Sequence, residues 1–144
     1  MTRFQNNKLI LYSLILAFLG FLDSAYLTIE HYKNFAPPCT LHGCEKVLTS
    51  AFSMIGPIPV ALLGVIFYLA VIIICLMILI EGMKQLIKFF HLIIAVGFLV
   101  SVVLFLIQAV ILHAFCQYCL LSEAVSTGLL FLSLLKLREE RKSV

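Results

Sequence analysis

The sequence predicts an all-α integral membrane protein: a four-helix bundle with an external loop and a short surface helix between spans one and two. Its composition is the first indication, because 63% of the 144 residues are hydrophobic and 12% are charged. A soluble domain of this size needs a larger polar shell than 10 basic and 7 acidic residues provide. The chain is therefore expected to form one membrane domain over residues 1–144.

The second indication is a set of four uninterrupted apolar stretches. Each contains 21 to 24 residues, and they cover residues 9–29, 58–80, 89–112 and 114–135. A helix needs roughly 20 residues to cross the hydrocarbon core of a bilayer. Because the backbone must satisfy its own hydrogen bonds in lipid, four helices packed as a bundle are expected.

A cleaved signal peptide is the alternative for the first stretch, since Arg3 and Lys8 precede an apolar run over residues 9–22. No suitable small-residue cleavage site follows that run. Apolar residues also resume after Asp23. Residues 9–29 are therefore interpreted as span one.

The third indication is the placement of the basic residues, which predicts orientation. Eight of the ten lie before span one, between spans two and three, or after span four: Arg3, Lys8, Lys84, Lys88, Lys136, Arg138, Arg141 and Lys142. Only Lys33 and Lys46 lie between spans one and two. By the positive-inside rule, both termini are cytoplasmic and the protein crosses the inner (cytoplasmic) membrane several times. This bias also accounts for the net charge of +3 without a nucleic-acid partner.

The cysteines form two pairs on the predicted outer face. Cys39 and Cys44 lie in the first external loop, and Cys116 and Cys119 lie at the outer start of span four. Disulfides persist outside the cytosol, so a C-x4-C and a C-x2-C on that face indicate two redox pairs. Cys75 lies among isoleucines inside span two and is expected only to pack.

The C-x2-C spacing suits thiol exchange. Cys116 near a helix N-terminus lies one turn before Cys119, so both sulfurs share a face and the first thiolate meets the positive end of the helix dipole. Two alternatives remain open at this point. The four thiolates could bind zinc, or the pairs could be static disulfides in a non-enzymatic membrane scaffold. The outward location and the membrane depth of Cys119 weigh against zinc, and no metal site is predicted.

The loop between spans one and two has a recognisable organisation. Pro37 and Pro38 stiffen the approach to Cys39, and residues 40–43 let the chain turn toward Cys44. Residues 45–55 mix apolar and polar side chains in a pattern compatible with a short helix on the membrane surface. Pro57 and Pro59 are expected to end that helix and start span two.

These features together resemble the vitamin K epoxide reductase family in its short bacterial form. The matching features are the order of the two cysteine pairs, Ser50 six residues after Cys44, and the Gly-x-x-x-Tyr of Gly64 and Tyr68. The resemblance covers nearly the whole chain. The related DsbB-type membrane oxidases carry their two pairs in the opposite order and are the second candidate.

The resemblance implies a role for each matched residue. Cys39 would meet a separate DsbA-type thioredoxin-fold partner, Cys44 would exchange with Cys116, and Cys119 would lie beside a quinone, either ubiquinone or menaquinone. Ser50 would position or polarise the quinone. Where the animal enzymes carry a tyrosine four residues after the second Cys of the C-x-x-C, this chain has Glu123. That departure favours oxidation of thiols over reduction of vitamin K epoxide.

Asp23 and Glu123 are acidic residues within apolar spans, where ionisable groups are costly and often functional. Glu123 follows Cys119 by four residues and so shares its helix face. A carboxyl there could relay a proton to the quinone, and both residues are predicted to belong to the quinone site. The alternative is that they only hydrogen-bond neighbouring helices, with Tyr26, Gln108 or Ser126 as partners.

Overall fold

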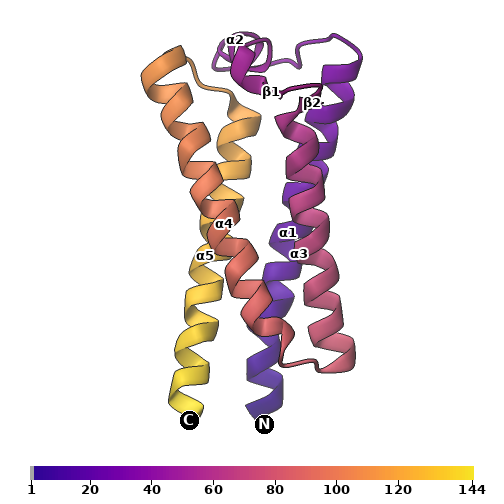
Figure 1. Cartoon of the computed structure of the whole chain (residues 1–144), viewed down its shortest axis with the longest axis vertical. Coiled ribbons are helices and arrows are strands. Elements are labelled where there is room, and N and C mark those ends of the chain that lie inside the picture. Colours follow the sequence, from indigo (N-terminus) through magenta and orange to yellow (C-terminus); the bar gives the residue numbers. More distant parts are fainter. Residues whose placement is uncertain (1) are drawn as a thin grey trace.

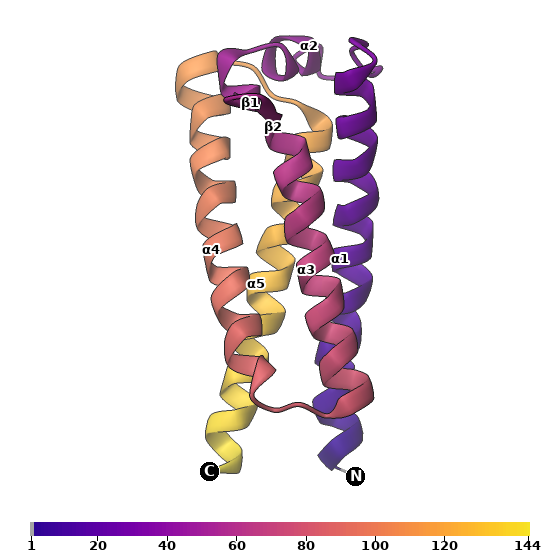
Figure 2. The ribbon, with the colours of Figure 1, turned by 45° about the vertical axis from the view of Figure 1, so that its right-hand side comes forward.

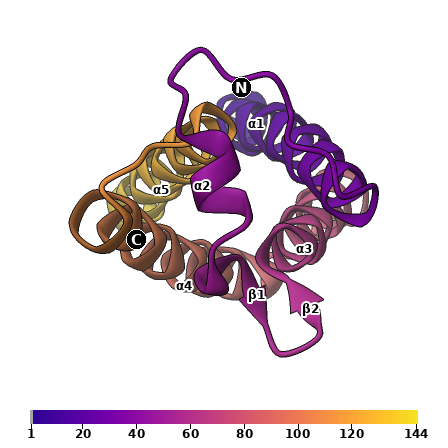
Figure 3. The same cartoon turned by 90° about the horizontal axis from the view of Figure 1, so that it is seen from above.

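The computed structural model describes residues 2–144, with the side chains described from residue 7 onward. Its frame consists of four long helices: α1 (Thr2–Tyr32), α3 (Val60–Glu81), α4 (Leu86–Leu106) and α5 (Gln117–Ser143). They run side by side around a common centre (Figures 1 and 3). Within the described chain, four helical segments are long and apolar enough to cross a membrane. The predicted all-α membrane bundle is confirmed.

The predicted span limits differ from the helices at their ends. α1 extends to Tyr32, and α5 continues to Ser143, because hydropathy marks only the part of a helix that needs lipid. Between spans three and four the prediction of an immediate restart at residue 114 was wrong. α4 passes into a π-helix, η2 (Ile107–Leu112), and residues 113–116 are not helical before α5 begins.

Both ends of the described chain lie at one end of the bundle, and the long connection between α1 and α3 covers the other end (Figures 1 and 2). This connection contains α2 (Cys44–Leu48), the 3-10 helix η1 (Ala51–Ser53), and the strands β1 (Met54–Ile55) and β2 (Ile58–Pro59). α2 lies across the end of the bundle, over the space between the long helices (Figure 3).

The predicted single helix over residues 45–55 was wrong in its second half. Only α2 and the short η1 are helical, and Met54 pairs with Pro59 in an antiparallel hairpin. The reversal occurs at Gly56, whose φ of 62° is a left-handed conformation that glycine adopts without steric cost. Pro57 therefore stands in the turn of a hairpin, and α3 begins after Pro59.

The core consists of apolar side chains from all four long helices. Its fully buried members include Ile10, Ala17, Val71, Cys75, Phe90, Ile94 and Leu129. Cys75 has no exposed surface, as its packing role requires. Large apolar side chains such as Phe131 and Ile80 are exposed on the outside, where lipid would contact them.

Tyr68 links α3 to α5 inside this core. Only 2% of its surface is exposed, and its hydroxyl donates to the backbone carbonyl of Ser122 at 3.0 Å. The same hydroxyl lies 2.8 Å from the Ser122 Oγ. A buried hydroxyl without such partners would be costly, so these contacts fix the register of the two helices.

We expect Tyr68→Phe to lower the free energy of unfolding by about 0.5–1.5 kcal/mol, the usual contribution of one intramolecular hydrogen bond. The loss arises because the Ser122 hydroxyl keeps no tyrosine partner. Unfolding by sodium dodecyl sulfate, followed by circular dichroism, measures it. Tyr12→Phe is the matched control, since Tyr12 is 54% exposed on α1. Equal stability of both variants would contradict the role given to Tyr68.

Candidate functional site

The two cysteine pairs differ in their redox state. Cys39 and Cys44 form a disulfide, with their Cα atoms 5.9 Å apart. Cys116 and Cys119 are both free thiols. The structure therefore holds an oxidised pair in the loop and a reduced pair at the start of α5. Cys39 and Cys44, as a disulfide, are not available as thiolate ligands for zinc in this state.

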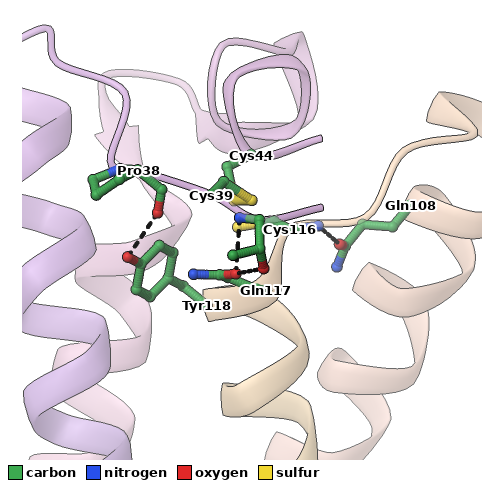
Figure 4. The surroundings of a disulfide bond; sticks show 8 residues. Pro38, Cys39, Cys44, Gln108, Cys116, Gln117 and Tyr118 are labelled. Atoms are coloured by element: carbon green, nitrogen blue, oxygen red, sulfur yellow. Dashed lines mark hydrogen bonds between the residues drawn. A yellow bond between two sulfur atoms is a disulfide. The ribbon is translucent and has the colours of Figure 1, made fainter. Parts of the chain in front are cut away.

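The loop brings the two pairs together. Cys44 and Cys116, which are 1% and 0% exposed, belong to one buried cluster with Val47. Cys39 and Cys119 pack against the same cluster. Figure 4 shows the disulfide beside Cys116 at the start of α5. Residues separated by more than 70 positions in sequence thus form one sulfur-rich site.

The two residues between Cys116 and Cys119 hold the loop in place (Figure 4). The Gln117 Oε1 accepts from the Thr40 backbone N–H at 3.1 Å and from the Thr40 hydroxyl at 2.6 Å. The Tyr118 hydroxyl donates to the Pro38 carbonyl at 3.0 Å. These hydrogen bonds fix the chain on both sides of Cys39. No pattern in the sequence indicated this role for Gln117 or Tyr118.

Gly43 permits the closest approach of the loop. A Cβ atom at this position would collide with the backbone carbonyl and amide of Phe115. Backbone atoms cannot move aside as the end of a flexible side chain can. Cys44, the next residue, therefore reaches Cys116 because residue 43 has no side chain.

The surroundings of the Cys116 thiol lower its pKa. It stands at the N-cap position immediately before α5 and thus outside the membrane-spanning helix. A hydrogen bond from the Cys119 thiol, joined by the backbone N–H groups of Cys119 and Tyr118, holds the pKa of Cys116 below its usual value, although burial opposes this. The N-terminal position in the helix adds to the preference for a thiolate.

A cavity of about 760 Å³ lies among the long helices beneath the loop. Its walls come from α1, the segment 47–55, α3, α4, η2 and α5, and are mostly apolar. Cys119, Ser50 and Glu123 all line it. A small number of polar groups in a largely apolar cavity of this size is typical of a site for an organic cofactor or ligand.

Of the polar residues predicted for the quinone site, Ser50 and Glu123 line the cavity and Asp23 does not. The Ser50 hydroxyl donates to the Val47 carbonyl at 2.7 Å, so Ser50 keeps only acceptor capacity toward the cavity. Asp23 is buried on α1 but does not line the cavity, and its Oδ2 has no hydrogen-bond partner among the described residues. The assignment of Asp23 to quinone binding stays a prediction.

Glu123 is bonded to one of the partners predicted for it. The Gln108 Nε2 donates to the Glu123 Oε1 at 2.8 Å. The Gln108 Oε1 accepts from the Cys116 backbone N–H at 3.0 Å. One side chain therefore connects the carboxyl in the cavity to the redox cysteine. The sequence suggested the first contact, whereas the second depends on the π-helix η2 and had no sequence signal.

Comparison with known proteins agrees with this geometry. The sequence model of the vitamin K epoxide reductase family matches residues 11–134, which include both cysteine pairs and parts of all four long helices. No curated protein matches the sequence. Members of the matching family are oxidoreductases that link thiols to quinones.

The close contact at Gly43 gives a test of the site. In a chain lacking Cys39 and Cys119, Gly43→Ala should slow oxidative crosslinking of Cys44 to Cys116 by roughly tenfold or more, because small displacements of reacting groups are costly. Mass spectrometry of the linked peptides measures the rate. Leu41→Ala, an exposed position in the same loop, should crosslink at the unsubstituted rate. Equal rates for both variants would show that the Phe115 contact does not control the approach.

Proposed function

The chain belongs to the vitamin K epoxide reductase family, and we propose that it re-oxidises a separate thioredoxin-fold protein for disulfide formation outside the cytoplasm, with a quinone as electron acceptor. The observation that carries this proposal is the buried cluster that joins Cys44 to Cys116 above a cavity lined by Cys119. This arrangement supports a route for electrons from Cys39 near the surface to a ligand in the cavity.

Differences in exposure support an order for the relay. Cys39 is half-buried, whereas Cys44 and Cys116 are fully buried. A thiolate of the partner would therefore attack Cys39 and release Cys44. The Cys44 thiolate would then attack Cys116 of an oxidised Cys116–Cys119 pair and release Cys119. The second partner thiolate would release Cys39 and leave the partner oxidised, and Cys39 would attack Cys44 and release Cys116. Each exchange forms one disulfide bond and breaks another, so that two electrons move inward.

The last step transfers these electrons to the quinone. The Cys116–Cys119 dithiol loses two electrons and two protons and becomes a disulfide, while the quinone gains both and becomes a quinol. An oxidised outer pair with a reduced inner pair, the combination found in the structure, would be the state before this step. Ubiquinone and menaquinone both have the quinone ring that this reaction requires.

The arrangement of the chain ends supports the proposed orientation. α2, which begins at Cys44, and the start of α5, which follows Cys116, lie at the end of the bundle opposite to the ends of the described chain (Figure 1). With the basic residues that flank the spans on the cytoplasmic side, the cysteine end faces outward. A soluble thioredoxin-fold partner of the DsbA type would then meet Cys39 in an oxidising compartment.

Two alternatives have less support. A scaffold held by static disulfides would need both pairs to be crosslinked, yet Cys116 and Cys119 are free thiols in a buried redox cluster. A DsbB-type oxidase would carry its C-x-x-C in the first external loop, and this chain carries it at the start of α5.

Turnover tests the proposed function. The purified chain in lipid, supplied with a reduced DsbA-type protein and ubiquinone or menaquinone, should oxidise many equivalents of that protein per chain and reduce an equal amount of quinone. Thiol titration and quinone absorbance follow the two half-reactions. Cys75→Ala should turn over like the unsubstituted chain, because Cys75 only packs in the core. Oxidation that stops at two equivalents with quinone present would support the scaffold instead.

Trapping tests the order of the relay. Mixed disulfides are normally resolved by a neighbouring thiolate. With Cys39→Ala and Cys119→Ala combined, a Cys44–Cys116 bond has no local resolving thiol and should accumulate. Non-reducing mass spectrometry of proteolytic fragments would detect it. The converse variant, with Cys44→Ala and Cys116→Ala, should remain mostly unlinked. Linkage of Cys39 to Cys119 there, without linkage in the first variant, would reverse the assigned roles.

Glu123 is the proposed proton donor to the quinone. Glu123→Gln should leave thiol exchange between the pairs intact and slow quinone reduction by about 10²-fold, the lower end of the range for general acids. The pH dependence of that step should weaken as well, because glutamine does not titrate. Single-turnover absorbance of the quinone measures both effects. An unchanged rate at every pH would return Glu123 to a structural role.

A further inference from the structure

We propose that Gln108 is a positioning residue that determines which oxygen of Glu123 carries the transferable proton. The inference rests on the proposed function and adds a residue to its last step. It is carried by the two hydrogen bonds of the Gln108 amide and by the one oxygen of Glu123 that they leave without a partner.

The backbone holds Gln108 in place. It lies in the π-helix η2, where single π-turns often mark functional positions. Its backbone carbonyl accepts from the N–H of His113 and, at 3.2 Å, from the N–H of Ala114. The residue is only 3% exposed. The backbone of Gln108 is therefore hydrogen-bonded to the turn that precedes Cys116, and its buried side chain has little room to move.

The chemistry of its partners fixes the direction of the amide. The Cys116 backbone N–H can only donate, so it must face the Gln108 oxygen. The Gln108 NH₂ group then faces Glu123 and donates to its Oε1. Reversing the amide would set two donors against each other at Cys116 and two acceptors against each other at an ionised Glu123. Neither arrangement forms a hydrogen bond.

This direction has a consequence for Glu123. Because its Oε1 always accepts from Gln108, a protonated carboxyl must carry its hydrogen on Oε2. That oxygen is buried without a hydrogen-bond partner among the described side chains, and Glu123 lines the cavity. The proton is thus on the buried oxygen that no described protein group binds, in a residue that lines the cavity.

The proton balance of the last step follows. The Oε2–H group gives its proton to a quinone oxygen as the dithiol gives up two electrons. The resulting carboxylate recovers one of the two protons that Cys116 and Cys119 release, and the quinone receives the other. Dithiol and quinone become disulfide and quinol, and Glu123 ends in its starting state.

Single-turnover kinetics of four chains test this coupling: the unsubstituted chain, Gln108→Leu, Glu123→Gln and the double variant. Gln108→Leu should slow quinone reduction by about tenfold or more, part of what a general acid contributes, and weaken its pH dependence. In the Glu123→Gln background, Gln108→Leu should slow quinone reduction by less than about twofold, since the two residues act as a unit. Gln85→Leu, at the exposed other end of α4, should have no effect. Equal slowing in both backgrounds would overturn the proposal.

Infrared spectroscopy provides a readout without turnover. A protonated Glu123 should give a carboxylic C=O band that Glu123→Gln removes. In Gln108→Leu this band should shift to higher frequency, because the hydrogen bond to Oε1 is lost. An unshifted band, or the absence of any band that depends on Glu123, would overturn the proposal. A chain that shows the shift but reduces no quinone would contradict the proposed function while leaving the role of Gln108 intact.

Discussion

The contact between Cys44 and Cys116 is the feature on which the site depends, and it requires the loop between α1 and α3 to lie directly on the turn before α5. Thr40, Gln117 and Tyr118 supply the hydrogen bonds, and Gly43 supplies the space. Because thiol exchange needs direct attack of sulfur on sulfur, a loop held slightly farther away would separate the two redox pairs. In the proposed relay, residues without redox chemistry of their own would therefore control whether electrons can pass.

The membrane imposes a second constraint on polar groups inside the bundle. Hydroxyl groups satisfy it locally: Ser13 donates to the Leu9 carbonyl and Thr28 to the Ser24 carbonyl, one helical turn earlier. Carboxyl groups cannot do so, because an ionised carboxylate only accepts and the helix N–H groups are already used. Glu123 instead receives its hydrogen bond from a different helix, through Gln108. A polar partner from elsewhere in the fold is thus a requirement of its position.

The sequence was sufficient for features that depend on composition and spacing. Hydropathy located the four spans, and the C-x4-C motif located the disulfide between Cys39 and Cys44. The sequence was insufficient where a few local hydrogen bonds determine the conformation of the backbone. A hairpin at Gly56 stands where the second half of a helix was predicted. The π-helix η2 and the non-helical residues after it mean that α5 begins only at Gln117. The hydrogen bond from Thr40 to Gln117 could not be predicted either, since it joins residues 77 positions apart whose identities carry no pairing signal.

The molecule has two parts that are held together differently: the bundle of long helices and the loop segment around Cys39. The long helices share a continuous apolar core, which gives the cavity fixed walls. The loop segment around Cys39 is fastened to α5 by a few hydrogen bonds near the surface, and such bonds are individually weak. Under the proposed function, a partner protein that reaches the half-buried Cys39 would displace this segment without disturbing the core. When the segment returns, the same bonds would place Cys44 against Cys116 again, so a loop held by a few bonds would serve both partner access and the proposed electron transfer.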